Sequence, residues 1–145
     1  MEILLCADME SGVFFNGRRQ SQDRELRKRI LRRIGREKLY VTSYSAKQFM
    51  EDEWDGKLEI CGNPLAEARA AYCFVEDCPL AQAADREDIE AIVIYRWDKV
   101  YPADTWLKLP ANGTHASDWL LCESTSFAGY SHEKITEEVY RRGRQ

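Results

Sequence analysis

The chain has 145 residues, of which 44% are hydrophobic and 32% charged, and its formal net charge is −4. This length suffices for one core of ordinary size and is too short for two full domains, so we expect a single domain over residues 1–145. No apolar run approaches the roughly 18 residues of a membrane span, and the N-terminus carries an acid where a signal peptide carries base, which predicts a cytoplasmic protein without a membrane partner.

The first third of the chain predicts a strand, a loop and a helix. Ile3 to Ala7 is an apolar run of strand length, and a polar, Gly-bearing loop follows it through Gly17. Between Ser21 and Gly35, large apolar residues recur every four positions, which places one apolar stripe on a helix that Gly35 ends. The stripe consists of Leu26, Ile30 and Ile34.

The middle of the chain predicts two short strands, each followed by a short helix. Lys38 to Ser43 and Lys57 to Cys61 have the composition of strands. Ser45 and Gln48 have the spacing of a capping box, which predicts a helix to about Met50. Asn63-Pro64 is expected to open another helix through Arg69.

The second half predicts the centre of the sheet and a hairpin. Ala71 to Val75 and Ile89 to Trp97 are continuously apolar, as in central strands covered on both faces. Asp77 is a natural N-cap for a helix between them. Asp118 to Phe127 and Ile135 to Arg142 flank a Gly-bearing turn and are expected to pair. The pattern therefore predicts an α/β fold: a mostly parallel sheet of about seven strands, an antiparallel C-terminal hairpin and about four flanking helices.

The segment AYCFVEDCPLAQAADREDIEAIVIYRWDKVYPADTWLKLP resembles the second half of dihydrofolate reductases. In that family a buried strand ends in a Gly-Gly turn, a short helix and a second strand follow, and the chain then reads Gly-Asp-Thr-x-Phe-Pro. Ala103-Asp104-Thr105 stands in the place of Gly-Asp-Thr. DWLLCESTSF and ITEEVYRR are similar to the family's last two strands.

The N-terminal part, ILLCADMESGVFFNGRRQSQDRELRKRI, resembles the family's first strand, active-site loop and first helix. Here Arg19-Gln20 replaces the usual Pro-Trp after the loop. The resemblance covers nearly the whole chain and lies in order and spacing, with few identities. It implies a dihydrofolate-reductase-like fold.

The resemblance also implies a nicotinamide cofactor, whose phosphates need glycine turns at two helix N-termini. The first turn here reads Thr42-Ser43-Tyr44-Ser45-Ala46-Lys47 and has no glycine. The second reads Val75-Glu76-Asp77-Cys78-Pro79, and its two carboxylates would repel a pyrophosphate. We therefore expect no cofactor and no NADPH-dependent reductase activity.

The substrate half of the pocket has residues that match the family. The resemblance implies a carboxylate at the start of the first helix that binds a pterin ring, and a threonine that hydrogen-bonds to it. Asp23 and Thr105 are the candidates, and Glu25 competes with Asp23. Alternatively, Asp23 is only a first-turn acid favoured by the helix dipole and Thr105 only a strand residue.

Further candidate ligand-binding residues surround this pair. Arg18 and Arg19 lie in the loop that would flank the pocket, where a guanidinium can clamp a carboxylate or phosphate. Trp97 and Tyr101 lie near the end of a central strand, where α/β sheets bind ligands, although edge packing explains them equally well. Ser21 and Tyr44, within the two segments quoted above, complete the set. His132 falls in the hairpin turn and is expected to be solvated.

Residues 18–38 hold ten of the 21 Lys and Arg residues, which could mark a surface for RNA or a phosphorylated ligand. Such a run is more often a solvated helix face. The sequence thus predicts a divergent dihydrofolate-reductase-like domain that binds a small anionic or heterocyclic ligand or serves as an interaction module. The alternatives are an RNA-binding protein and an active reductase. No catalytic residue or metal site is assigned.

Overall fold

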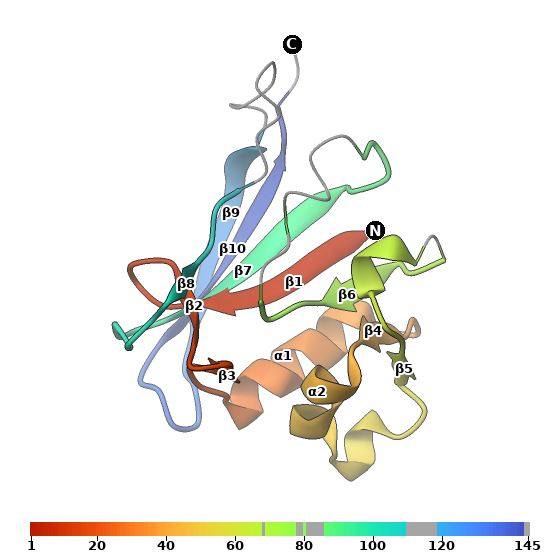
Figure 1. Ribbon diagram of the computed structural model, residues 1–145, viewed down its shortest axis with the longest axis horizontal. Coiled ribbons are helices and arrows are strands. Elements are labelled where there is room, and N and C mark those ends of the chain that lie inside the picture. The colour runs from red at the N-terminus through yellow and green to blue at the C-terminus, as the bar shows by residue number, and fades with distance from the viewer. Residues whose placement is uncertain (68, 78–79, 81–85, 110–118, 144–145) are drawn as a thin grey trace.

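Figure 1 shows the computed structural model of the chain, which describes residues 1–67, 69–77, 80, 86–109 and 119–143. Its main sheet contains Glu2–Ala7 (β1), Leu39–Val41 (β4), Leu58–Ile60 (β5), Tyr72–Phe74 (β6), Ala91–Trp97 (β7), Trp119–Phe127 (β9) and Ile135–Arg142 (β10). The strand order is β5-β4-β6-β1-β7-β10-β9. The first five of these run parallel, and β10 is antiparallel to both β7 and β9. The mostly parallel sheet with a C-terminal hairpin is confirmed.

The central strands are buried on both faces, as their continuous apolar runs predict. In β1, Ile3 and Leu5 point into one core, whereas Leu4 points into the other. β6 lies directly beside β1, with Ile3 opposite Cys73. The expected central position of the Ala71 to Val75 segment is therefore confirmed, and Glu76 and Asp77 follow its carboxyl end.

The helix Arg24–Ile34 (α1) covers one face of the sheet, together with the short helix Ser43–Ala46 (α2) (Figure 1). The predicted stripe of Leu26, Ile30 and Ile34 is buried against that face. Asp23 is the N-cap of α1, and Gly35 ends the helix with φ of 58°, a left-handed conformation that glycine adopts readily.

The expectation of four helices is wrong for the described residues, which form two α-helices. The two segments predicted as short helices contain 3₁₀ turns instead, Lys47–Phe49 (η1) and Pro64–Ala66 (η3), and a further 3₁₀ turn, Asp52–Trp54 (η2), was not predicted. Segments this short gain too few hydrogen bonds to offset the cost of helix nucleation. The helix expected after Asp77 lies largely outside the described residues. No helix within the described ranges is long and apolar enough to cross a membrane.

The cap of α2 also differs from the prediction. Thr42, rather than Ser45, is the N-cap, and its side chain accepts a hydrogen bond from the Ser45 backbone N–H. The side chains of Ser45 and Gln48 both donate to the Glu76 carboxylate instead. A contact across the fold has thus replaced the local capping box.

A second sheet was not predicted. Gly12–Phe15 (β2), Arg18–Arg19 (β3) and Thr105–Trp106 (β8) pair in the order β3-β2-β8 where the sequence indicated a loop. Asn16 and Gly17 both have positive φ, of 56° and 72°. An Asn-Gly pair with these angles between two strand residues is the signature of a two-residue hairpin turn. This small sheet lies at the carboxyl end of β1 (Figure 1).

The apolar stripe of α1 gives a first prediction. Ile30 is fully buried, whereas Arg32 on the same helix is exposed. Ile30→Ala should lower the free energy of unfolding by about 3 kcal/mol because it removes buried methyl groups and leaves a cavity. Arg32→Ala should change it by less than about 0.5 kcal/mol. Urea denaturation measures both, and equal effects would contradict this packing.

Candidate functional site at the carboxyl edge of the sheet

The carboxyl ends of β4, β6, β1 and β7 meet at one edge of the main sheet, where open α/β sheets bind their ligands. Two groups of polar side chains lie there. The Glu76 cluster consists of Arg19, Tyr44, Ser45, Gln48 and Glu76. The His132 cluster consists of Ser21, Asp23, Trp97, Tyr101 and His132. The segment Arg19-Gln20-Ser21 joins the two clusters and contributes to both.

Four hydrogen bonds hold the Glu76 carboxylate directly after β6. Arg19 donates to both oxygens, from Nε to Oε1 at 2.7 Å and from Nη2 to Oε2 at 3.0 Å. Ser45 Oγ donates to Oε2 at 2.8 Å and Gln48 Nε2 to Oε1 at 3.0 Å. The two-point geometry makes this the strong form of an arginine–carboxylate pair. Glu76 is therefore neutralised by Arg19.

Arg19 is fixed on its other side by Tyr44. Its guanidinium lies 4.4 Å from the centre of the Tyr44 ring, and its backbone N–H donates to the Tyr44 hydroxyl at 3.1 Å. Burial opposes the charged form of Arg19, but the hydrogen bond and charge of Glu76 outweigh it and raise the pKa of the guanidinium. The cation is thus committed to a contact within the protein.

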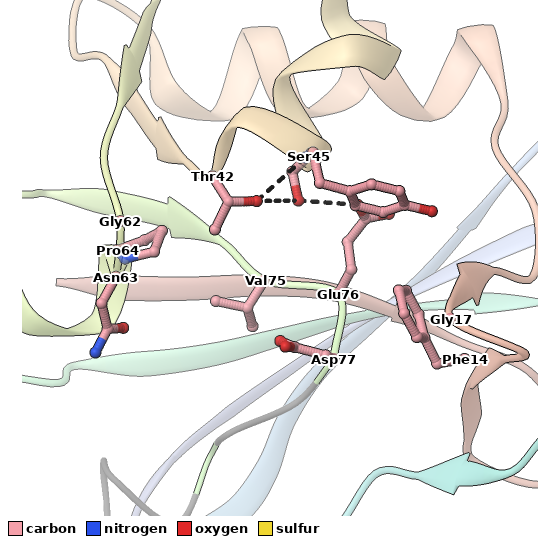
Figure 2. Close-up of a pocket in the computed structure, with 11 residues that line it drawn as sticks. Phe14, Gly17, Thr42, Ser45, Gly62, Asn63, Pro64, Val75, Glu76 and Asp77 are labelled. Atoms are coloured by element: carbon pink, nitrogen blue, oxygen red, sulfur yellow. Dashed lines mark hydrogen bonds between the residues drawn. The ribbon is translucent and has the colours of Figure 1, made fainter.

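A pocket of about 530 Å³ opens beside Glu76. Figure 2 shows Thr42 and Ser45 above it, Asn63 and Pro64 on one side and Phe14 on the other. Val75, Glu76 and Asp77 run along its floor. Asp77 is exposed and has no hydrogen-bond partner among the described residues. The pocket therefore offers aromatic and hydroxyl groups and one carboxylate that is available to a ligand.

The Asp23 carboxylate is the centre of the other cluster. It is buried and accepts hydrogen bonds from the backbone N–H groups of Glu25 and Leu26 in α1. It also accepts from the N–H groups of Tyr130 and Ser131 in the loop between β9 and β10. Burial alone would raise the pKa of Asp23, but the hydrogen bonds from His132 and these N–H groups outweigh it and hold that pKa well below its ordinary value.

The His132 ring is held on three sides. Nδ1 lies 2.9 Å from Asp23 Oδ2, and Nε2 lies 3.1 Å from Ser21 Oγ and 3.0 Å from the Tyr101 hydroxyl. The ring stacks on Trp97, with centroids 4.4 Å apart and planes 22° apart. Because the ionised Asp23 can only accept, Nδ1 carries a proton. In the neutral ring Nε2 is then an acceptor for the Ser21 or Tyr101 hydroxyl.

Gly129 allows this loop to close over Asp23. A Cβ atom at position 129 would lie 2.7 Å from the His132 carbonyl oxygen and 2.9 Å from Asp23 Oδ2. Both distances are shorter than Cβ contacts in proteins, and the first involves rigid backbone. A glycine is therefore required for the close approach of the loop to Asp23.

The structure brings together most of the predicted site residues, but not in the predicted way. The expectation of a solvated His132 is wrong: the side chain is 2% exposed because Asp23 and Trp97 draw the loop inward. The hydrogen bond expected between Asp23 and Thr105, direct or through one water, is not formed directly between the two side chains. Thr105 pairs with Phe14 in the small sheet, and its hydroxyl donates to Asp104.

The remaining candidates lie outside the two clusters. Glu25 forms an exposed ion pair with Lys28 on α1, at 3.3 Å. Arg18 is exposed and lines a second pocket of about 460 Å³ together with Arg19, Gln20 and Tyr101. The Glu25 backbone N–H donates to Asp23, but the Glu25 side chain pairs with Lys28 instead.

Three of the six basic residues of α1 pair with acids from elsewhere in the fold. Arg27 pairs with Glu51, Arg29 with Glu137 and Arg33 with Glu2. The shortest N–O distances in these pairs are 2.7, 2.9 and 2.9 Å. Such pairs reduce the positive charge that this helix presents to a polyanion.

Comparisons of the chain with protein-family models and with curated proteins found no match. Within the described part of the chain, no group of three or more His, Cys, Asp or Glu residues is placed to hold a metal ion. The site thus offers one neutralised carboxylate in Glu76, one accessible carboxylate in Asp77, and a histidine whose Nε2 faces two hydroxyl groups.

The buried Asp23 carboxylate gives a second prediction. In Asp23→Asn, an NH2 group replaces one carboxylate oxygen and cannot accept the hydrogen bonds that this oxygen receives. The free energy of unfolding near pH 6 should therefore fall by about 2–4 kcal/mol. The pKa of Asp23 is lower in the folded chain than its ordinary value of 3.8. Its contribution is therefore complete above that value and decreases as the pH falls below it.

The difference in stability between the wild type and Asp23→Asn should accordingly narrow between about pH 6 and pH 3. Urea denaturation at both pH values measures it. The exposed Asp55→Asn variant is the matched control and should remain close to the wild type at both. A gap that stays constant over this range would contradict the assigned role of Asp23.

Proposed function

We propose that this protein is a divergent dihydrofolate-reductase-like domain that binds a small heterocyclic ligand in the pocket beside Glu76. The observation that carries the proposal is a pocket of about 530 Å³ at the carboxyl ends of β4, β5 and β6, with aromatic side chains and an accessible carboxylate. Volumes of this size accommodate small organic ligands. The mostly parallel sheet with a C-terminal hairpin supports the family resemblance of the sequence.

The charges around the pocket favour a heterocycle over an anion. Arg19, the cation nearest to Glu76, is used by that carboxylate, so the pocket retains the negative charge of Asp77. A phosphate or carboxylate ligand would be repelled, whereas ring N–H or amino groups would find an acceptor. Phe14 and Tyr44, which pack edge to face with ring centroids 6.0 Å apart, give the pocket an aromatic wall for a planar ring.

The same charges argue against a dinucleotide cofactor. A pyrophosphate approaching the carboxyl end of β6 would meet Asp77, and the turn Val75-Glu76-Asp77 has no glycine for close approach of the backbone. The RNA alternative has weaker support, because three arginines of α1 are bound to Glu51, Glu137 and Glu2.

Thermal denaturation with a panel of compounds tests the proposal. Pterin, guanine and 2,4-diaminopyrimidine supply planar rings with amino groups, and NADPH supplies the pyrophosphate. At about 1 mM, a ring compound with a Kd of about 0.1 mM should raise the melting temperature by about 3–5 °C by mass action. NADPH should not raise it.

Asp77→Asn should abolish the shift, because the amide no longer offers a charged acceptor. Glu37→Gln removes an equal charge at an exposed position outside the pocket and should leave the shift unchanged. The proposal fails if none of the three ring compounds stabilises the protein, if Asp77→Asn retains the full shift, or if NADPH stabilises it as strongly.

A further inference from the structure

The His132 cluster contains an acid, a histidine and a serine in contact, and the ligand pocket beside Glu76 does not use them. Asp23 Oδ2 lies 2.9 Å from His132 Nδ1, and His132 Nε2 lies 3.1 Å from Ser21 Oγ. These distances are those of a hydroxyl nucleophile, its base and the group that orients the base. The three residues come from the loop before α1 and the loop between β9 and β10, brought together by folding.

The protonation of the ring suits a base. Asp23 is ionised and accepts a hydrogen bond from Nδ1–H, so Nε2 of the neutral ring has its lone pair directed at Ser21 and Tyr101. Trp97 packs on the ring face and restricts its rotation. His132 is thereby held in the orientation required to take a proton from Ser21.

Space and an unused acceptor lie next to Ser21. Ser21 is partly exposed and lines a cavity of about 10 Å³, room for one water at most, with Arg19, Gln20 and Trp97. Gln20 also lines the neighbouring pocket of about 460 Å³ with Tyr101, and Ser21 lies next to that pocket without lining it. Gln20 Oε1 is buried and has no hydrogen-bond partner among the described residues. Buried acceptors are rarely left unpaired, so a donor such as water is expected at Gln20 Oε1.

We propose that Ser21 is a nucleophile toward small uncharged esters, with His132 as its base and Asp23 as the residue that positions His132. The second pocket, beside Tyr101, would hold the ester. This proposal stands independently of the ligand in the pocket beside Glu76.

The reaction proceeds by two acyl transfers. Ser21 Oγ bonds to the ester carbonyl carbon and its proton passes to His132 Nε2; the carbon–oxygen bond to the alcohol then breaks and the alcohol takes that proton. Water next attacks the acyl-serine, giving a proton to Nε2 that returns to Ser21 Oγ as the carboxylic acid leaves.

Ser131, next to the His132 cluster, provides a comparison serine. Its hydroxyl lies 3.2 Å from His132 Nδ1 and donates to Asp23 at 3.1 Å. It is more exposed than Ser21, but it faces the nitrogen that carries the proton. Exposure alone would favour reaction at Ser131, whereas activation by His132 favours Ser21.

The test is covalent labelling of the full chain with a small alkyl fluorophosphonate, followed by intact mass measurement and peptide mapping. The serine oxygen bonds to phosphorus, fluoride leaves, and the proton passes to His132. We expect one adduct on Ser21 in the folded wild type and none in urea that unfolds the chain. Ser21→Ala should abolish labelling, and His132→Gln should slow it by about 100-fold or more.

Ser131→Ala should still form the Ser21 adduct, and Tyr101→Phe, which removes the competing hydroxyl at Nε2, should label at least as fast as the wild type. Circular dichroism establishes that each variant is folded. The position of the adduct in the wild type tests the proposal even if a variant does not fold. The absence of a Ser21 adduct in the folded wild type, equal labelling of the unfolded chain, or a dominant adduct on Ser131 would overturn the proposal.

Discussion

The fold at the carboxyl edge depends on the burial of one carboxylate, that of Asp23. This group caps α1 and simultaneously binds the loop between β9 and β10, through N–H groups more than 100 residues away. A buried carboxylate is costly unless it is fully hydrogen-bonded, and here backbone donors, Ser131 and His132 satisfy it. The contact fixes the start of α1, the hairpin loop and, through His132 and Trp97, the end of β7. Because the Asp23 contact fixes His132, the hydroxyl groups of Ser21 and Tyr101 both lie against Nε2 of its ring.

A second buried carboxylate determines the character of the neighbouring pocket. The Glu76 carboxylate forms an ion pair with Arg19 and accepts hydrogen bonds from the side chains of Ser45 and Gln48. This arrangement stabilises the carboxyl end of β6 and leaves Asp77 as the accessible charge in the pocket. The electrostatics of this edge therefore follow from two internal pairs, Asp23 with His132 and Glu76 with Arg19. The Arg19-Gln20-Ser21 segment contacts both pairs, through Arg19 and Ser21.

The centre of the main sheet could be predicted from sequence because its central strands are continuous apolar runs, and α1 because Leu26, Ile30 and Ile34 recur every four residues. The small sheet was missed although Asn16-Gly17 between strand-like residues is a recognisable hairpin signal. The helix at Ser45 was misplaced because its capping residues are used by Glu76, a partner 31 residues away. Local pattern cannot reveal such competition.

The candidate site was predicted in its parts rather than in its arrangement. The sequence singled out Asp23, Ser21, Trp97 and Tyr101. The residue that contacts all four, His132, lies in a turn whose sequence predicts a solvent-exposed side chain. Its contact with Asp23 spans 109 residues. Gly129 was the available signal, because a glycine near a turn also permits close approach to another segment.

The protonation of the His132 ring tests the central claim most directly. The chain has two histidines, so long-range ¹H–¹⁵N correlation spectra of the wild type and of His132→Gln identify the signals. At about pH 9, where a histidine is ordinarily neutral, we expect the ring proton on Nδ1 and a bare Nε2, because the Asp23 carboxylate lies 2.9 Å from Nδ1. A proton on Nε2 instead would contradict both the Asp23–His132 hydrogen bond and the activation of Ser21.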